Sequence, residues 1–224
     1  MPLQQLPLWV QLGAFLLALN AGMINVIGLI TLLHQSVSHM TGNASMLAIS
    51  LFKGDISSII FLILIILSYV LGSSYSGFIL GNSHFKVGRR YGLPLSLMTL
   101  FIVLSWCFIA NYPRYGLLWA CAAMGIQNAM VSHYQGAIIR TTHLSGVLTD
   151  LGLALGYLFR GLQVEKKRVI LHLLILFGFI FGGVIATAAY PYLKLDTFLI
   201  PALLSFSLSC IYWLIYFRIH YLVK

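Results

Sequence analysis

The chain has 224 residues, of which 60% are hydrophobic and only 8% charged, and its formal net charge is +9. Soluble domains carry roughly 25% charged residues, so this composition excludes a water-soluble fold and predicts an integral membrane protein. The apolar runs are long and lack alternation of polar and apolar residues, which favours an all-α protein over an outer-membrane barrel. The length predicts a single membrane domain, residues 1–224.

Six segments approach the roughly 20 apolar residues that a helix needs to cross a bilayer. In chain order they are Leu8–Leu33, Ser57–Gly81, Leu93–Asn111, Gly116–Ile139, Val169–Tyr190 and Thr197–His220. No Lys or Arg precedes the first segment and no Ala-x-Ala site follows it, so we expect a retained helix and not a cleaved signal peptide.

Two further apolar stretches, Thr41–Phe52 and Leu144–Phe159, are shorter, and each is followed by a basic residue and a glycine. If each crosses the membrane, the chain has eight spans. If each re-enters on the side from which it came, the chain has six transmembrane helices plus two half-helix segments. The sequence pattern by itself leaves both alternatives open.

The basic residues of the loops favour six spans, because loops rich in Lys and Arg stay in the cytoplasm. Eight alternating spans divide the 13 Lys and Arg residues eight against five. Six spans place ten on one side, because only Lys53, Arg114 and Lys194 then lie on the other. The ten are Lys86, Arg89, Arg90, Arg140, Arg160, Lys166, Lys167, Arg168, Arg218 and Lys224. Both termini are then cytoplasmic, and the net charge reflects topology and lipid headgroups and not nucleic acid.

Three short motifs recur about a hundred residues apart. GMIN (Gly22–Asn25) corresponds to GIQN (Gly125–Asn128), SHMTG (Ser38–Gly42) to THLSG (Thr142–Gly146), and LFKG (Leu51–Gly54) to LFRG (Leu158–Gly161). These matches predict two repeat halves, about residues 1–110 and 111–224. With three spans in each half, the second is inverted relative to the first, as in transporters whose broken helices meet near the midplane.

Hydroxyl residues stand at the start of each short segment. Ser38 or Thr41, and Thr142 or Ser145, are predicted N-caps whose oxygens accept from free backbone N–H groups. The glycine of each motif lets backbone or ligand come close. Two half-helix N-termini inside the protein would present N–H donors and positive dipole character to an anionic or dipolar solute. The alternative is that both motifs only cap short helices.

Asp150 is the one acid of four that falls inside an apolar segment. Acids within a membrane are costly and mark ion paths or proton relays. His143 lies seven residues earlier, on the same helical face, so the two could share a proton. Alternatively, Arg140 holds Asp150 in a structural ion pair. The counterpart of Asp150 in the first half is near Met46, so acid-based chemistry is expected in the second half only.

Four amides, Asn20, Asn25, Gln127 and Asn128, lie inside the first and fourth spans, where they either bridge helices or line a pathway. No carboxylate lies near His34 and His39, so we expect no metal site, and no cofactor motif is present. The predicted substrate or ion pathway comprises Asn25, Ser38, His39, Thr41, Gly42, Asn43, Asn128, Arg140, Thr142, His143, Ser145, Gly146 and Asp150.

The stretches NAGMINVIG, SHMTGN, GIQNA and RTTHLSGVLTDLG together resemble the YoaK-like family of bacterial membrane proteins over nearly the whole chain. The resemblance implies an inner-membrane protein of about six spans without a settled activity. The loop GNSHFKVGRR (Gly81–Arg90) also resembles the Gly-x-x-x-Asp-Arg-x-Gly-Arg-Arg loop of major facilitator transporters, with Phe85 in place of the aspartate. This second likeness implies a half-sized relative, which would act as a homodimer.

These features predict a transporter-like protein of the bacterial inner membrane that moves a small polar or anionic solute, with protons as the candidate coupling ion. The alternatives are a channel and a non-transporting scaffold or assembly protein. An intramembrane hydrolase with Ser145 and His143 or His39 is least favoured, because no GxSxG or HExxH motif is present. We therefore expect no enzyme. The expected partners are the lipid bilayer, the solute and a second copy of the chain.

Overall fold

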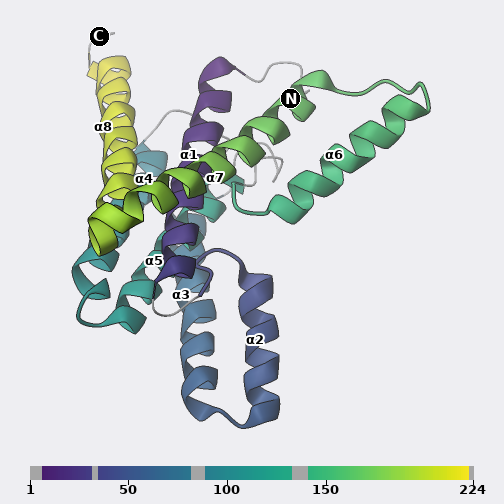
Figure 1. Cartoon of the computed structure of the whole chain (residues 1–224). Helices are drawn as coiled ribbons and strands as arrows, with labels where there is room; N and C mark the ends of the chain where they lie inside the picture. Colours follow the sequence, from purple (N-terminus) through teal and green to yellow (C-terminus); the bar gives the residue numbers. More distant parts are fainter. Residues whose placement is uncertain (1–6, 32–34, 82–88, 133–140, 222–224) are drawn as a thin grey trace.

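The computed structural model describes residues 7–31, 35–81, 89–132 and 141–221 (Figure 1). Within these ranges the chain forms eight α-helices and one 3₁₀ helix, and no strand occurs in them. The all-α prediction is confirmed for this part of the chain. The helices are α1 (Leu8–Ile30), α2 (Met40–Lys53), α3 (Ile56–Leu80), α4 (Arg89–Ile109), α5 (Pro113–Ser132), α6 (Leu144–Phe159), α7 (Lys166–Leu193), the 3₁₀ helix η2 (Lys194–Phe198) and α8 (Leu199–Tyr221).

The α-helices fall into two length classes. Six have between 20 and 28 residues, whereas α2 has 14 and α6 has 16. At 1.5 Å per residue, α2 and α6 reach roughly 21–24 Å, less than a hydrocarbon core of about 30 Å. The first helix is shorter than expected and ends at Ile30, because the backbone of Thr31 is extended and its hydroxyl donates to the Gly28 carbonyl at 2.9 Å.

Four helical stretches of the described chain are long and apolar enough to cross a membrane: Leu8–Ile30, Ile56–Leu80, Arg90–Ile109 and Lys166–Ile219. The last of these covers α7, η2 and most of α8. Large apolar side chains on these stretches remain exposed, such as Phe78 at 84%. Extended apolar surfaces of this kind are rare on soluble monomers. The chain is therefore a helical membrane protein.

Each short helix continues in the general direction of the long helix before it (Figure 1). The chain descends through α1 and again through α2, and it then ascends through α3. In the second half it ascends through α5 and obliquely through α6, and it descends through α7. Helices α2 and α6 thus pair with the helices that follow them in two hairpins whose tips point in different directions.

Long helices of one half pack against long helices of the other half: α1 packs along α7, and α5 packs along α3. Glycines make both crossings close. A Cβ on Gly22 would lie 2.0 Å from the Phe179 carbonyl oxygen, and a Cβ on its counterpart Gly125 would lie 2.1 Å from the Tyr69 carbonyl oxygen. Neither position has room for any larger residue, so the helix backbones are in direct contact.

The partner helix at each crossing also carries a glycine that lies against a backbone carbonyl. A Cβ on Gly182 would lie 2.0 Å from the Leu19 carbonyl oxygen, and one on Gly72 would lie 2.1 Å from the Ala122 carbonyl oxygen. The small-residue segment of α3 therefore packs against that of α5, and the small-residue segment of α7 packs against that of α1. These two glycine crossings form the centre of the fold.

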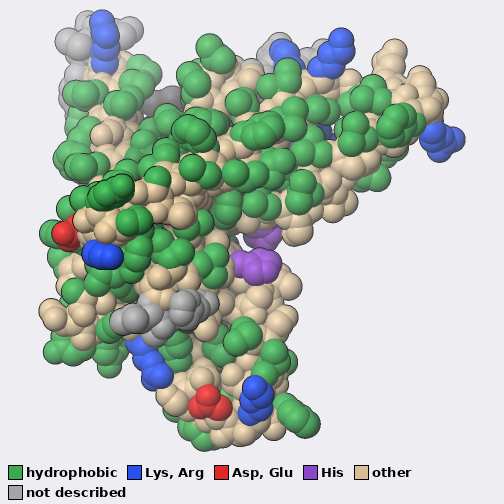
Figure 2. Space-filling view, in the orientation of Figure 1, with side chains coloured by type: hydrophobic (Ala, Val, Ile, Leu, Met, Phe, Trp, Pro, Cys, Tyr) green, Lys and Arg blue, Asp and Glu red, His purple; other side chains and the backbone are tan. Residues whose placement is uncertain are grey.

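The short helices project from this centre with little burial. Helix α2 buries only Asn43 and Ser50 among its residues, and α6 buries only Val147. In Figure 2 the surface is indented between the α2–α3 hairpin and the α6–α7 hairpin, and histidine side chains lie at the inner end of the indentation. The exposed histidines of the described chain are His39 and His143.

Candidate functional site at the two half-helix junctions

Asn25 anchors the link between α1 and α2. Its side-chain oxygen Oδ1 accepts from the hydroxyls of Ser36 at 2.8 Å and Ser38 at 3.2 Å, and from the backbone N–H groups of Val37 and Ser38 at 3.1 Å each. Asn25 lies five residues before the end of α1, so the link folds back beside its last turns. The backbone N–H groups of Val37 and Ser38 thereby find partners inside the fold.

A second set of hydrogen bonds joins the same link to the start of α2. The Ser36 hydroxyl oxygen accepts from the His39 N–H at 3.1 Å, and the Asn43 amide Nδ2 donates to the Ser36 carbonyl at 3.0 Å. Asn43 is buried at 2% exposure. The first turn of α2 is therefore fixed to its own link, independently of the second half of the chain.

Asn128 occupies the corresponding place at the α5–α6 junction, with different partners. Its Oδ1 accepts from the Thr142 hydroxyl at 2.8 Å, and its Nδ2 donates to the Tyr69 hydroxyl of α3 at 2.7 Å. The structure thus brings Asn128 and Thr142 together, as it does Asn25 and Ser38. Unlike Asn25, Asn128 also connects its junction to the other half of the chain.

A buried amide cluster adjoins the second junction. The Gln127 amide Nε2 donates to the Leu17 carbonyl at 2.9 Å and to the Thr141 hydroxyl at 3.0 Å, while its Oε1 accepts from Asn20 at 3.3 Å. Asn20, Gln127 and Thr141 are fully buried. The Asn20 Oδ1 atom has no hydrogen-bond partner within the described residues. These amides bridge α1 to α5, so the bridging alternative describes Asn20 and Gln127.

The predicted N-caps are wrong. The N-cap residues of α2 and α6 are His39 and His143, and neither side chain makes a capping hydrogen bond. The hydroxyls of Ser38 and Thr142 bond instead to the anchoring amides of the preceding helices, because the links fold back against α1 and α5. The first N–H groups of both short helices thus lack side-chain caps from these residues, and the positive ends of both helix dipoles adjoin exposed imidazoles.

The remaining motif residues lie at the surface around these N-termini. Thr41 and Ser145 are exposed, and Gly146 is half-buried. A Cβ on Gly42 would lie 2.6 Å from Cδ2 of the His39 ring, so the glycine makes room for that imidazole. Arg140 lies outside the described residues.

Asp150 bonds to side chains of α7. Its Oδ2 accepts from Nη2 of Arg168 at 3.0 Å and lies 3.5 Å from Nε2 of His172. The His172 side chain is 3% exposed, whereas those of Asp150 and Arg168 are 34% and 43% exposed. The sequence pattern indicated only His143 and Arg140 as partners, so Arg168 and His172 were not predicted. Their spacing of four on one helical face, directly after a short loop, was the available signal.

This cluster, Asp150 with Arg168 and His172, has no counterpart of the same chemistry in the first half. The motif spacing places Met46 opposite Asp150, and alignment of the N-caps Asp55 and Glu165 places Ser58 and Leu62 opposite Arg168 and His172. Within the described ranges, no group of three or more His, Cys, Asp or Glu side chains could hold a metal ion. The arrangement therefore offers N–H donors, imidazoles and one acid–base cluster in place of a metal centre.

The helix lengths, the exposed apolar surface and the two junctions define a helical membrane protein in which two short helices, α2 and α6, each follow a long one. The chain belongs to a family described as "Protein of unknown function (DUF1275)", which matches residues 13–211. No curated protein and no solved structure matches it. The expectation of an uncharacterised family is confirmed. The YoaK-like resemblance stays a prediction, as does the major facilitator likeness, whose loop falls largely on residues 82–88, outside the described ranges.

Proposed function

We propose that the chain has six transmembrane helices and two re-entrant half-helices, α2 and α6, with both termini in the cytoplasm of a bacterium. The directions in Figure 1 support this topology, because each short helix continues the course of the long helix before it and does not return across the bilayer. The tip of the α6–α7 hairpin carries Arg160 and the run Lys166–Arg168, whereas that of the α2–α3 hairpin carries Lys53 beside Asp55. The positive-inside rule places these tips on opposite sides.

On this topology the protein transports a small polar or anionic solute between the N-termini of α2 and α6. The observation that carries the proposal is the pair of half-helices that begin on amide-anchored links without side-chain caps. Half-helix N-termini near the midplane bind anionic groups in other transporters because their N–H groups and dipoles point at the ligand. His39 and His143 add donors, and positive charge when protonated.

Protons are the proposed coupling ion, and Asp150 is the proposed proton-linked residue. The carboxylate faces a buried imidazole and a permanent cation on α7, and an acid in a membrane helix marks an ion path by default. Because the first half has no acid at the equivalent place, coupling would act on α6 alone. A channel is the alternative that needs no coupling to protons. The proposal includes no catalytic step.

Water access to the two N-termini tests the proposal without knowledge of the solute. His39→Cys and His143→Cys would be placed singly in a background with Cys107, Cys121 and Cys210 replaced, and membrane-impermeant maleimide would be applied from each side. A transport pathway predicts labelling of position 39 from outside and position 143 from inside. A sealed scaffold predicts no labelling at either position, and that result would overturn the transport proposal. Val147→Cys, on a buried α6 residue, is the control for non-specific labelling.

A further inference from the structure

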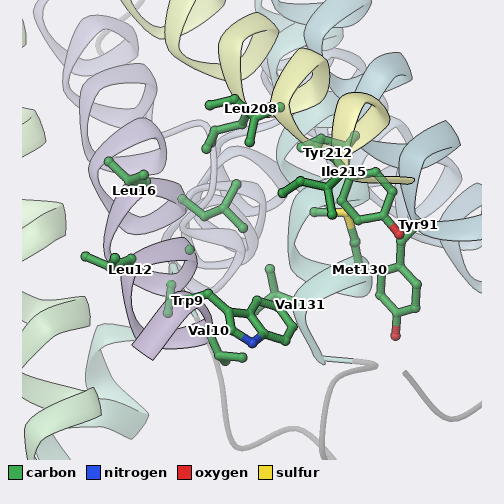
Figure 3. A pocket seen from close by; sticks show the side chains of 15 residues that line it. Trp9, Val10, Leu12, Leu16, Tyr91, Met130, Val131, Leu208, Tyr212 and Ile215 are labelled. Carbon is green, nitrogen blue, oxygen red and sulfur yellow. The ribbon is translucent and has the colours of Figure 1, made fainter. Parts of the chain in front are cut away.

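The two halves differ in how their last helices pack. Helix α4 packs along α5, to which residues 110–112 join it in a short turn. The counterpart pair, α8 and α1, lies at opposite ends of the chain with no such turn, and α8 packs mainly on α4. A groove therefore separates α8 from α1 where the other half has a closed helix contact (Figure 3).

This groove has a volume of about 360 Å³, within the range of small-ligand pockets. Its walls are apolar side chains of α1 and α8, such as Leu12, Leu16, Leu208 and Ile215, and Met130 of α5 contributes to its floor. Its lining is almost entirely apolar, which suits a hydrocarbon chain.

Aromatic and basic residues mark one end of the groove. Trp9 and Tyr91 lie at this end, the kind of side chain that is enriched at the membrane–water interface. Arg90 precedes Tyr91 in α4, and Arg218 lies about one turn beyond Ile215 on α8. Both arginines are exposed. Helices α4 and α8 are adjacent here, because a Cβ on Gly92 would lie 2.7 Å from the Trp213 ring.

We propose that this groove binds an anionic phospholipid, with one acyl chain between α1 and α8 and the phosphate near Arg90 and Arg218. The apolar walls select a hydrocarbon chain, and the two guanidinium groups select negative charge at its head. On the topology proposed above this end faces the cytoplasm, where anionic lipid is attracted to basic residues. The lipid site itself does not depend on transport.

Native mass spectrometry of the purified full chain tests the site with two probes, palmitoyl-oleoyl phosphatidylglycerol and the matching phosphatidylcholine. We expect the wild type to retain one phosphatidylglycerol roughly tenfold or more in preference to phosphatidylcholine, and the Arg90→Gln/Arg218→Gln variant to lose that preference. Equal retention of both lipids by the wild type would overturn the proposal.

Gly13→Leu tests the groove itself. Gly13 lines it, and a Cβ there would meet no other atom within 4 Å, so leucine fills the groove without an imposed clash. Gly77→Leu is the matched control, because Gly77 of α3 is equally open but lies outside the groove. We expect Gly13→Leu to abolish retention and Gly77→Leu to leave it unchanged. Unchanged retention in Gly13→Leu contradicts the proposal, as does a wild-type dimer that Gly13→Leu dissociates.

Quenching of Trp9 fluorescence by phosphatidylglycerol brominated on its acyl chain gives a second measurement should Gly13→Leu fail to fold. Trp106, Trp119 and Trp213 would be replaced by phenylalanine, so that Trp9 alone reports. We expect brominated phosphatidylglycerol to quench Trp9 at roughly tenfold lower concentration than brominated phosphatidylcholine. Identical quenching curves for the two lipids would overturn the site.

Discussion

The α1–α2 junction and the α5–α6 junction are both anchored by an asparagine, but the contacts that hold the short helix after each junction differ. At the first, Asn25 accepts four hydrogen bonds from its own link, and Asn43 secures the first turn of α2. At the second, Asn128 accepts a hydrogen bond from Thr142, and the contacts that hold α6 include the Asp150 cluster on α7. Within the described residues, α2 is held by its own link, whereas α6 is held by charged groups of another helix as well.

The two junctions show which residues the repeated motif keeps in both halves and which contacts differ between them. Both halves keep an amide on the long helix, a hydroxyl on the link and a histidine at the N-cap. The contacts beyond these residues differ, because Met46, Ser58 and Leu62 cannot form the contacts that Asp150 makes with Arg168 and His172. We therefore expect α2 to be the more rigid half-helix and α6 the one whose position responds to protonation.

The largest expected effect concerns the shared centre of the fold. Gly22→Ala and Gly125→Ala each place a Cβ about 2 Å from a carbonyl oxygen of the partner helix, so both should lower the free energy of unfolding by about 3 kcal/mol, the upper part of the overpacking range. Unfolding by SDS in mixed micelles, followed by circular dichroism, measures the loss. Gly152→Ala, where a Cβ meets nothing within 4 Å, is the control and should not destabilise. A difference of more than about 1 kcal/mol between the two crossings would contradict their equivalence.

Removal of the anchoring amides should distinguish the junctions. Asn25→Ala deprives four donors of their acceptor and should lower the free energy of unfolding by about 2–3 kcal/mol, at roughly 0.6 kcal/mol per hydrogen bond in a membrane protein. Asn128→Ala removes the two hydrogen bonds that Asn128 makes with the described residues Tyr69 and Thr142, and their loss should cost about 1 kcal/mol. The same SDS titration measures both. Equal losses would mean that the hydrogen bonds of Asn25 stabilise the protein no more than those of Asn128.

The Asp150 cluster gives a smaller effect that is confined to one half. Asp150→Asn weakens the ion pair with Arg168 and the contact with His172, and because Asp150 and Arg168 are partly exposed the free energy of unfolding should fall by only about 0.5–1 kcal/mol. Hydrogen–deuterium exchange should increase in α6 and remain unchanged in α2. The matched control is Met46→Asn, at the equivalent position of the first half. Unchanged exchange in α6 would contradict the expectation that the position of α6 responds to protonation of this cluster.

The smallest effect concerns the hairpin turns. The Asp55 carboxylate accepts from the Ser58 hydroxyl at 2.6 Å and from the Ser58 N–H at 3.2 Å, and these hydrogen bonds lower the pKa of Asp55 below its ordinary value of 3.8. A lowered pKa stabilises the turn above the unfolded pKa, and this contribution is lost as the pH falls through the folded value. Ser58→Ala should return the pKa towards 3.8, as NMR titration of Asp55 would detect.

Glu165 is the matched residue at the α6–α7 turn. It is the N-cap of α7 but makes no side-chain capping hydrogen bond. Glu165→Gln should therefore leave the stability of its turn unchanged. If Ser58→Ala does not move the Asp55 pKa, the hydrogen bonds of Ser58 are not the cause of the shift.

The sequence by itself determined the helical membrane class and the places of the short helices, because helix length and apolar composition follow from local residues alone. It also marked Asn25, Asn128 and the hydroxyl motifs, since polar residues in apolar runs are few. The predicted capping role of these hydroxyls is wrong, because a Ser or Thr before a helix can cap that helix or bond to another element, and only the path of the link decides between these partners.

Tertiary structure alone decided which helices meet. The exchange of α1 onto α7 and α5 onto α3 depends on backbone contacts at Gly22 and Gly125, which composition cannot direct to a particular partner. Asp150 faces Arg168 and His172 because the α6–α7 hairpin brings them alongside; the spacing of these two residues marks them as a pair on α7 but does not identify Asp150 as their partner. The groove between α1 and α8 likewise exists only in the assembled fold, because no short turn holds the two ends of the chain together.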